Sequence, residues 1–188
     1  MKKKRRKMKP GGGAKKGSAF ERKMAGVLSK WWYGETGYLW RRPGPGTRFF
    51  KKDKHRHSGD IVPSVDRRAP KEFPFHAELK CFSKARLKLD MLLWPDRNPI
   101  KKIWTKALEE RRAGLMPMLI LKANNTPIIC VMRRTDLKIL VNKSGFDDVK
   151  DVVTNHVQYD DIDMDWVVYV FPFDDLLKLK VKHAKIVR

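Results

Sequence analysis

The segment FPFHAELKCF, residues 73–82, constrains the fold more than any other part of the sequence. Side chains along a β-strand alternate between two faces. As a strand, this segment separates its residues into an apolar face and a polar face: Phe73, Phe75, Ala77, Leu79 and Cys81 on one, His76, Glu78 and Lys80 on the other. The apolar face predicts packing against a core. The polar face places an acid and a lysine about 6–7 Å apart along the strand.

The net charge indicates the kind of partner. The chain has 188 residues, enough for one domain with a core, and 43 Lys and Arg against 21 Asp and Glu give a net charge of +22. Such a surface favours a polyanion. No apolar run is long enough to span a membrane, and the basic N-terminus does not lead into a secretory signal. Nucleic acid is therefore the expected partner. The two cysteines lack metal-binding or disulfide spacing, which suits an intracellular protein.

Periodicity and turn residues predict the order of the elements. Residues 1–17 are expected to form a flexible basic arm, and residues 18–188 a single domain. Within that domain we expect helices at 18–33, 100–113 and 173–180, strands at 38–42, 60–62, 73–82, 116–123, 127–132 and 166–171, a basic loop at 43–59, and a solvated acidic face at 147–165. This order predicts an α/β fold in which a central mixed β-sheet is flanked by helices.

Two further acids occupy constrained positions, and each has a plain structural interpretation. Glu21 lies on the same helical stripe as Met24 and Leu28, where a carboxylate is costly unless a positive group meets it. However, Ser18 and Glu21 also have the spacing of a capping box, which would give Glu21 no other role. Asp60 follows a glycine and could be an ordinary turn residue. Glu78 and Lys80 could be an exposed ion pair worth about 0–1 kcal/mol.

Five short segments together carry a resemblance to a known family: KGSAFERK (16–23), RRPGPGTR (41–48), GDIVP (59–63), HAELK (76–80) and PMLILKANNTPIICVM (117–132). They resemble the archaeal-type Holliday junction resolvases of the PD-(D/E)xK nuclease superfamily, including viral relatives. The resemblance covers roughly residues 16–135 and implies a restriction-endonuclease-like core at 18–135. Beyond it, residues 136–188 are expected to form a C-terminal extension with a strand and a short helix. Two departures stand out: Gly59-Asp60 replaces Pro-Asp, and the loop before Asp60 is longer and more basic.

The resemblance also implies the roles of the site residues. Asp60 and Glu78 would hold Mg²⁺ or Mn²⁺, with the Leu79 backbone carbonyl as a further ligand and Glu21 acting directly or through water. Lys80 would orient or deprotonate the attacking water and stabilise developing charge. Hard divalent ions prefer such carboxylate oxygens, so the residue types agree with hydrolysis of a phosphodiester.

Basic and hydroxyl side chains near these acids are the expected DNA contacts: Arg22, Arg41, Arg42, Thr47, Arg48, Lys51, Lys52 and Ser58. Arg22 could instead be a solvated helix residue. Thr47 lies where resolvases carry a catalytic serine, and Ser58 is the rival for that position. His76 is interpreted as a DNA contact or as a hydrogen-bond donor behind the site.

The sequence therefore predicts a Mg²⁺-dependent endonuclease that acts on branched or duplex DNA. The favoured interpretation is a homodimeric Holliday junction resolvase that makes paired nicks, because a two-fold dimer matches a junction of the same symmetry. The alternatives are a sequence-specific restriction or homing-type enzyme of the same fold, and a DNA-binding protein without catalytic activity.

Overall fold

The computed structural model of the protein describes residues 12–42, 59–64, 66–70, 72–82, 99–146, 148–153, 157–161 and 166–179. Residues 1–11 of the predicted basic arm and residues 43–58 of the predicted basic loop lie outside these ranges. In the described part, no helix is long and apolar enough to cross a membrane.

The elements follow the predicted order, with one added helix and one added strand besides a short 3-10 turn. They are α1 (Gly12–Tyr33), β1 (Leu39–Arg41), β2 (Ile61–Pro63), β3 (Phe75–Phe82), α3 (Pro99–Glu110), β4 (Met116–Ala123), β5 (Ile129–Arg133), α4 (Arg134–Ser144), the 3-10 turn η4 (Val149–Asp151), β6 (Val157–Asp161), β7 (Trp166–Pro172) and α5 (Phe173–Lys178). The additions are α4 and β6, which fall in segments where no regular element is predicted.

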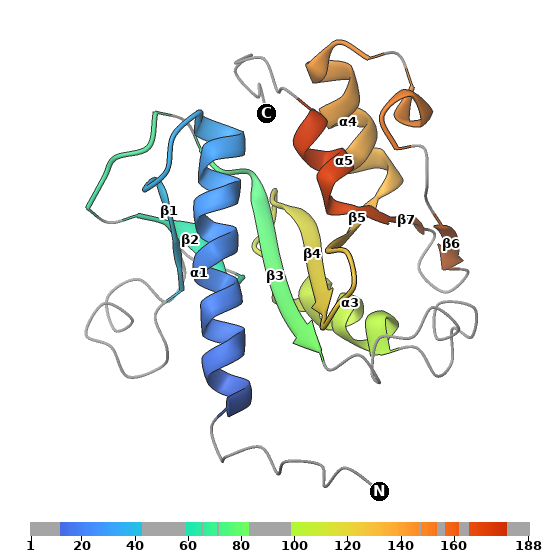
Figure 1. Cartoon of the computed structure of the whole chain (residues 1–188). Coiled ribbons are helices and arrows are strands. Elements are labelled where there is room, and N and C mark those ends of the chain that lie inside the picture. Colours follow the sequence, from blue (N-terminus) through green and yellow to red (C-terminus); the bar gives the residue numbers. More distant parts are fainter. Residues whose placement is uncertain are drawn as a thin grey trace, which may run out of the picture.

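The main sheet is mixed, as expected. Its five strands lie in the order β3-β4-β5-β7-β6. The β3–β4 pair is parallel and the other pairs are antiparallel. Because parallel neighbours need a crossover, the chain passes through α3 between β3 and β4. A second, two-stranded sheet of β1 and β2 lies on the other side of β3 (Figure 1). β3 is therefore an edge strand of the main sheet.

Helices cover both faces of the main sheet, and the interior strand β4 accordingly has apolar side chains on both of its sides. Met118 and Ile120 pack into the larger core, which α1, α4 and α5 share. Leu119 and Leu121 pack into a smaller core beneath α3. All four β4 side chains are fully buried. A continuous apolar run of this kind is typical of a strand that is covered on both faces.

The predicted start of the first helix is wrong by six residues, because α1 begins at Gly12. Ser18 therefore lies inside the helix and is not its N-cap. The interpretation of Ser18 and Glu21 as a capping box is wrong for the same reason. The other end agrees with the prediction: Gly34 has a φ of +83° and donates its N–H to the Lys30 carbonyl at 2.9 Å. A glycine in this left-handed conformation commonly ends a helix.

The C-terminal segment completes the larger core. Leu140 from α4 and Phe171 from β7 are buried in the same cluster as the α1 side chains. The Trp31 indole N–H on α1 donates to the Leu179 carbonyl, just past α5, at 2.8 Å. The helices α4 and α5 and the strand β7 are thus part of the same folded body as α1. Together with β6, they are more structure than the single strand and short helix that we expect from sequence.

Candidate active site

Three of the predicted site residues meet at the edge of β3 that faces away from β4. Glu78 and Lys80 share one face of the strand and form an ion pair through the Glu78 Oε1 and Lys80 Nζ atoms. Asp60 comes from the segment that leads into β2, and its Oδ2 lies 3.7 Å from the same Lys80 Nζ. All three side chains are partly buried, with exposed fractions between 14% for Glu78 and 37% for Lys80. The lysine ammonium therefore lies within ion-pair distance of both carboxylates.

Gly59 determines where Asp60 lies. Its φ is +88°, and a Cβ added there would lie 2.7 Å from the Ala77 carbonyl oxygen. Only glycine allows the backbone to approach β3 this closely in this conformation. The next residue completes the contact, because the Asp60 N–H donates to the same Ala77 oxygen at 2.8 Å. A proline, whose φ is fixed near −65°, could not adopt this turn. The departure from the Pro-Asp pattern thus has a definite structural reason.

The Asp60 carboxylate is also held by the strand it faces. Its Oδ2 accepts a hydrogen bond from the Leu79 backbone N–H at 2.8 Å. The N–H and C=O of one strand residue point to the same side of the strand, so the Leu79 carbonyl also points toward the edge where Asp60 lies. This orientation agrees with the predicted use of that carbonyl as a ligand.

The electrostatics of the site depend on these short separations. Burial raises the pKa of Asp60, and the neighbouring Glu78 carboxylate raises it further, while the Leu79 N–H and Lys80 oppose the rise. For Lys80, burial alone lowers the pKa, but its hydrogen bond to Glu78 and the charge of Asp60 outweigh burial and raise the pKa overall. Lys80 is therefore a cation near neutral pH.

Glu21 approaches the same edge from α1 but is engaged by another partner. Its Oε2 accepts a hydrogen bond from the Arg41 Nε atom at the end of β1. Its charge is also among the causes that raise the pKa of Asp60, so the two carboxylates interact electrostatically. Within the described ranges, no three His, Cys, Asp or Glu residues are grouped so that they could hold a metal ion. Glu21 is thus close enough to raise the pKa of Asp60, but it is not grouped with Asp60 and Glu78 as a third metal ligand.

The donor chemistry at the β3 edge suits a hard divalent cation. Asp60 and Glu78 offer carboxylate oxygens, and Leu79 offers a carbonyl oxygen on the same side. Burial raises the pKa of Asp60 most, and repulsion from the Glu78 carboxylate adds to the rise; a cation between the two carboxylates would remove that repulsion. In the arrangement described, the Lys80 ammonium provides this positive charge.

The predicted DNA-contact residues divide into two groups. Arg22 is exposed on α1, Arg41 is half-buried beside Glu21, and the Arg42 backbone N–H donates to the Asp60 carbonyl at 2.8 Å. All three arginines thus lie on the side of the molecule that carries the acids. The remaining predicted contacts lie outside the described residues: Thr47, Arg48, Lys51, Lys52 and Ser58.

The interpretation of His76 as a DNA contact is wrong, because its side chain is only 1% exposed. Neither ring nitrogen has a hydrogen-bond partner among the residues that the structure places, so the expected role as a donor is also without support. Burial lowers the pKa of His76, which favours the neutral imidazole. The residue lies on the same strand face as Glu78 but is covered.

Sequence reasoning missed two residues near the site. The contact of Gly59 with Ala77 depends on a strand sixteen or more residues later in the chain, so no local signal could reveal it. Trp40 had a usable signal: its alternation with the buried Leu39 on β1 indicates that it points away from the core. No prediction was made for it, and the structure shows Trp40 47% exposed.

A mixed sheet covered by helices on both faces, with acids and a lysine gathered at its edge, is the arrangement expected of a restriction-endonuclease-like nuclease. Comparison with protein families agrees. The model of the family described as "Phage putative PDDEXK endonuclease" matches residues 13–186, and the chain belongs to this family. The predicted fold class is confirmed. The match extends well beyond the predicted likeness at 16–135 and includes the C-terminal segment. Searches of curated proteins and of solved structures found no match.

Proposed function

We propose that the protein is a metal-dependent, structure-specific DNA endonuclease that resolves four-way junctions by paired nicks inside the cell that holds its substrate. The observation that carries the proposal is the meeting of Asp60, Glu78 and Lys80 at one strand edge. Membership of a PDDEXK endonuclease family supports nuclease activity, and the charge of +22 supports a DNA substrate.

Asp60 and Glu78 would hold Mg²⁺ or Mn²⁺, with the Leu79 carbonyl as a further ligand and Glu21 assisting directly or through water. When bound, such a cation supplies positive charge to a phosphodiester whose negative charge grows during hydrolysis. The protein's own contribution is to hold the two carboxylates in place. Gly59 and the Leu79 N–H do this for Asp60, and the strand backbone does it for Glu78.

Lys80 would orient the attacking water and stabilise negative charge, which are two of the roles expected from sequence. The third, removal of a proton from water, requires a neutral amine. Without a cation, the hydrogen bond to Glu78 and the charge of Asp60 outweigh burial, raise the pKa of Lys80 and disfavour the neutral amine, so proton removal would require a cation to engage these carboxylates in place of the lysine. The protonated lysine supplies water orientation and electrostatic stabilisation.

The three arginines around the acids would contact the phosphates of the substrate. Arg41 is well placed for this because Glu21 fixes its guanidinium through the Nε atom. A guanidinium held in this way loses less conformational entropy when it binds a phosphate. Phosphate contacts position a substrate without reading its sequence, which agrees with recognition by shape.

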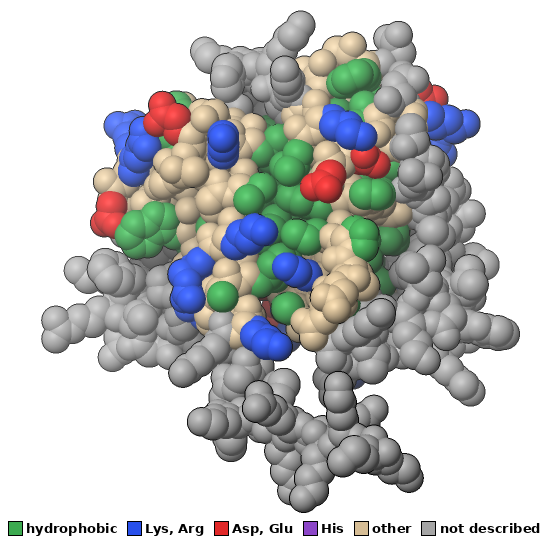
Figure 2. Space-filling model, viewed as in Figure 1, with side chains coloured by type: hydrophobic (Ala, Val, Ile, Leu, Met, Phe, Trp, Pro, Cys, Tyr) green, Lys and Arg blue, Asp and Glu red, His purple; other side chains and the backbone are tan. Residues whose placement is uncertain are grey.

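We further propose that the active form is a homodimer. Figure 2 shows hydrophobic side chains gathered along the middle of one face, between α1 and the pair of α4 and α5, with Lys and Arg side chains beside them. Partly buried side chains of these helices include Trp31 and Leu177. Light scattering should give twice the mass of the 22.0 kDa chain, and a monomer that still makes paired nicks would contradict the dimer.

One cleavage assay separates the candidate activities. A labelled four-way junction and a linear duplex of matched sequence are each incubated with the protein and Mg²⁺, with EDTA as the control. We expect symmetric nicks in the junction, little cutting of the duplex, and none in EDTA. Equal cutting of both substrates at one sequence would favour a restriction or homing-type enzyme. Binding without cutting, in Mg²⁺ and in Mn²⁺, would favour a non-catalytic protein.

A further inference from the structure

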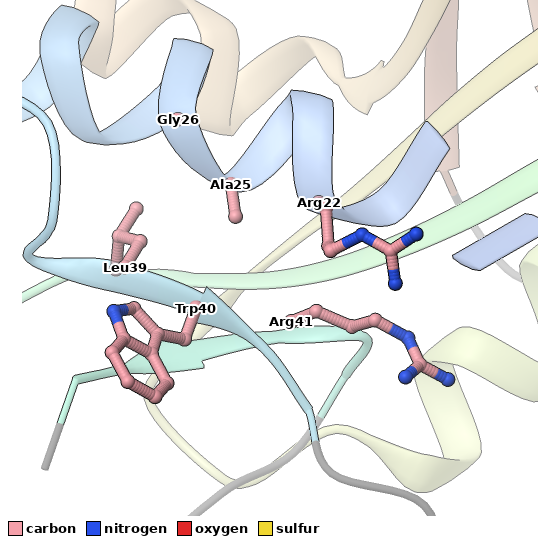
Figure 3. Close-up of a pocket in the computed structure, with 6 residues that line it drawn as sticks. All are labelled: Arg22, Ala25, Gly26, Leu39, Trp40 and Arg41. Atoms are coloured by element: carbon pink, nitrogen blue, oxygen red, sulfur yellow. The ribbon is translucent and has the colours of Figure 1, made fainter. Parts of the chain in front are cut away.

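A pocket with a volume of about 430 Å³ lies between α1 and β1, next to the candidate active site. Its lining residues are Arg22, Ala25, Gly26, Leu39, Trp40 and Arg41 (Figure 3). The volume falls in the range of roughly 300–1,000 Å³ that is usual for small-molecule sites. Arg41 connects the pocket to the active site, because its Nε donates to Glu21.

Small residues on α1 keep the pocket open. Gly26 has no side chain, and a Cβ added there would have no neighbour within 4 Å. Ala25 beside it is buried but short, and Leu39 from β1 is buried as well. Glycine in the middle of a helix is destabilising relative to alanine, and the open space around Gly26 would accept an alanine, so packing does not require a glycine there.

Trp40 and the two arginines give the pocket a particular chemistry. Trp40 is 47% exposed, which makes it the most exposed large hydrophobic side chain in the described part of the chain. Figure 3 shows that Arg22 from α1 and Arg41 from β1 extend in the same direction, away from the end where Trp40 lies. The pocket thus has an aromatic ring, a stacking surface, at one end and two guanidinium groups, which can donate to a phosphate, toward the other.

We propose that this pocket binds one unpaired nucleotide of the DNA substrate, with its base stacked on Trp40 and its phosphate held by Arg22 and Arg41. The bases of a duplex are stacked on one another, so their faces are available only where pairing is interrupted. A protein with this pocket selects DNA that has an unpaired nucleotide near the cleavage position. The inference rests on the proposed function and narrows its substrate class to junctions in which a nucleotide near the branch point is unpaired.

The test measures binding of the full-length protein to labelled oligonucleotides by fluorescence anisotropy in EDTA, where no cleavage occurs. The probes are a single strand, the matched duplex, and the duplex with one bulged nucleotide. Stacking of a base on an aromatic ring contributes about 1–3 kcal/mol, so Trp40→Ala should weaken binding of the single strand and the bulge about 5- to 150-fold. Duplex affinity should change less than twofold, and Trp40→Phe should restore most of the loss.

Two variants guard against a trivial effect on folding. Ile139→Ala removes another exposed hydrophobic side chain, 44% exposed on α4, and should change no affinity. Gly26→Leu fills the pocket with a good helix former, so it should weaken binding of unpaired DNA while the protein stays folded. Equal affinities of wild type, Trp40→Ala and Gly26→Leu for the bulged duplex would overturn the inference. So would an equal loss on all three probes.

The failure of this inference and the failure of the proposed function give different results. If wild type cleaves DNA in Mg²⁺ and Trp40→Ala keeps full affinity for unpaired DNA, only the pocket assignment is wrong. If wild type cleaves nothing but Trp40→Ala loses affinity for unpaired DNA selectively, the pocket assignment stands and the nuclease assignment is wrong.

Discussion

On one face of the main sheet, the side chains of β4 pack into a hydrophobic core, whereas those of the neighbouring strand β3 form the polar site. In the parallel register, Glu78 pairs with Leu119 and Lys80 pairs with Leu121. Both leucines are fully buried beneath α3, whereas Glu78 and Lys80 remain partly exposed at the sheet edge. Neighbouring strands are only about 4.8 Å apart, so the environment changes from apolar to charged across a single strand spacing. The polar site depends on β3 being an edge strand.

This comparison separates what holds the fold from what performs the chemistry. The leucines of β4 stabilise the protein by burial, at roughly 1.5–3 kcal/mol for each side chain. Glu78 and Lys80 occupy equivalent positions on β3 without that gain, and the charges of Glu78 and partly buried Asp60 repel each other. Changes on β3 should therefore affect activity more than stability, and changes on β4 should do the reverse.

The largest effect is expected for Glu78→Gln. The amide keeps the shape of the side chain but removes the charge that would hold a cation. Loss of groups that only support metal ligands costs about 10- to 100-fold, so loss of a ligand should reduce the cleavage rate more than about 100-fold. The measurement is single-turnover cleavage in Mg²⁺, together with DNA binding in EDTA, which should be unchanged or slightly tighter.

Glu109→Gln is the matched control, because Glu109 is an exposed acid on α3 and should tolerate the change. Cleavage by Glu78→Gln at the wild-type rate would exclude Glu78 from the site.

The next largest effect is expected on stability, for Leu119→Ala. Truncation of a fully buried leucine leaves a cavity and should reduce the free energy of unfolding by about 2–5 kcal/mol. Urea unfolding measures this change, and cleavage per folded molecule should stay within severalfold of wild type. If Leu119→Ala abolished cleavage while the protein remained folded, the separation of core from site would be wrong.

A loss of stability of similar size is expected for a change at Gly59, the residue that brings Asp60 against β3. Gly59→Ala introduces a residue at positive φ, which costs about 1–2 kcal/mol, and brings its Cβ against the Ala77 backbone. The clash should add about 1–3 kcal/mol and displace Asp60, so cleavage should also fall.

Gly114 provides the matched control for this substitution. It has a similar φ of +85° but open space around the position of a Cβ. Gly114→Ala should therefore show the cost of the backbone conformation alone. Equal destabilisation by the two variants in urea unfolding would mean that the approach of Gly59 to β3 carries no energetic weight.

The smallest effect is expected for Asp60→Asn in the absence of metal. The pKa of Asp60 is raised in the folded protein, so the folded state loses stability relative to the unfolded state as pH rises and the carboxyl ionises. The melting temperature of wild type relative to Asp60→Asn, measured in EDTA, should therefore fall between pH 4 and pH 7. Mg²⁺ should then raise the melting temperature of wild type alone. A melting-temperature difference that does not change with pH would contradict the raised pKa that burial and Glu78 give Asp60.

The sequence could predict the strands whose periodicity is strong. Alternation assigned the two faces of β3 up to Lys80, but Cys81, expected on the packed face, is exposed because the end of the strand is not covered. The apolar run at 116–123 marked a strand, and that strand is buried. The sequence did not predict α4, although Leu137, Leu140 and Val141 have helical spacing and are buried. That helix begins directly after β5 without a side-chain cap, so the usual signal at its N-terminus is missing.

The site was predictable in part. The spacing of Glu78 and Lys80 indicated a shared face, but only the resemblance connected them with Asp60 and Glu21, which lie on other elements. The structure places Asp60 beside the pair, and the catalytic roles of all four residues remain predictions. The ion pair of Glu21 with Arg41 and the approach of Gly59 to Ala77 depend on how distant segments pack, which no local pattern encodes.

The central claim is that Asp60 and Glu78 together form a cation site at the edge of β3. Its most direct test is titration of the metal-free protein with Mn²⁺, followed by electron paramagnetic resonance, for wild type, Asp60→Asn, Glu78→Gln and the Glu109→Gln control. We expect wild type and the control to bind Mn²⁺ at one site that both Asp60→Asn and Glu78→Gln lose. Equal Mn²⁺ affinity in all four proteins would contradict the claim.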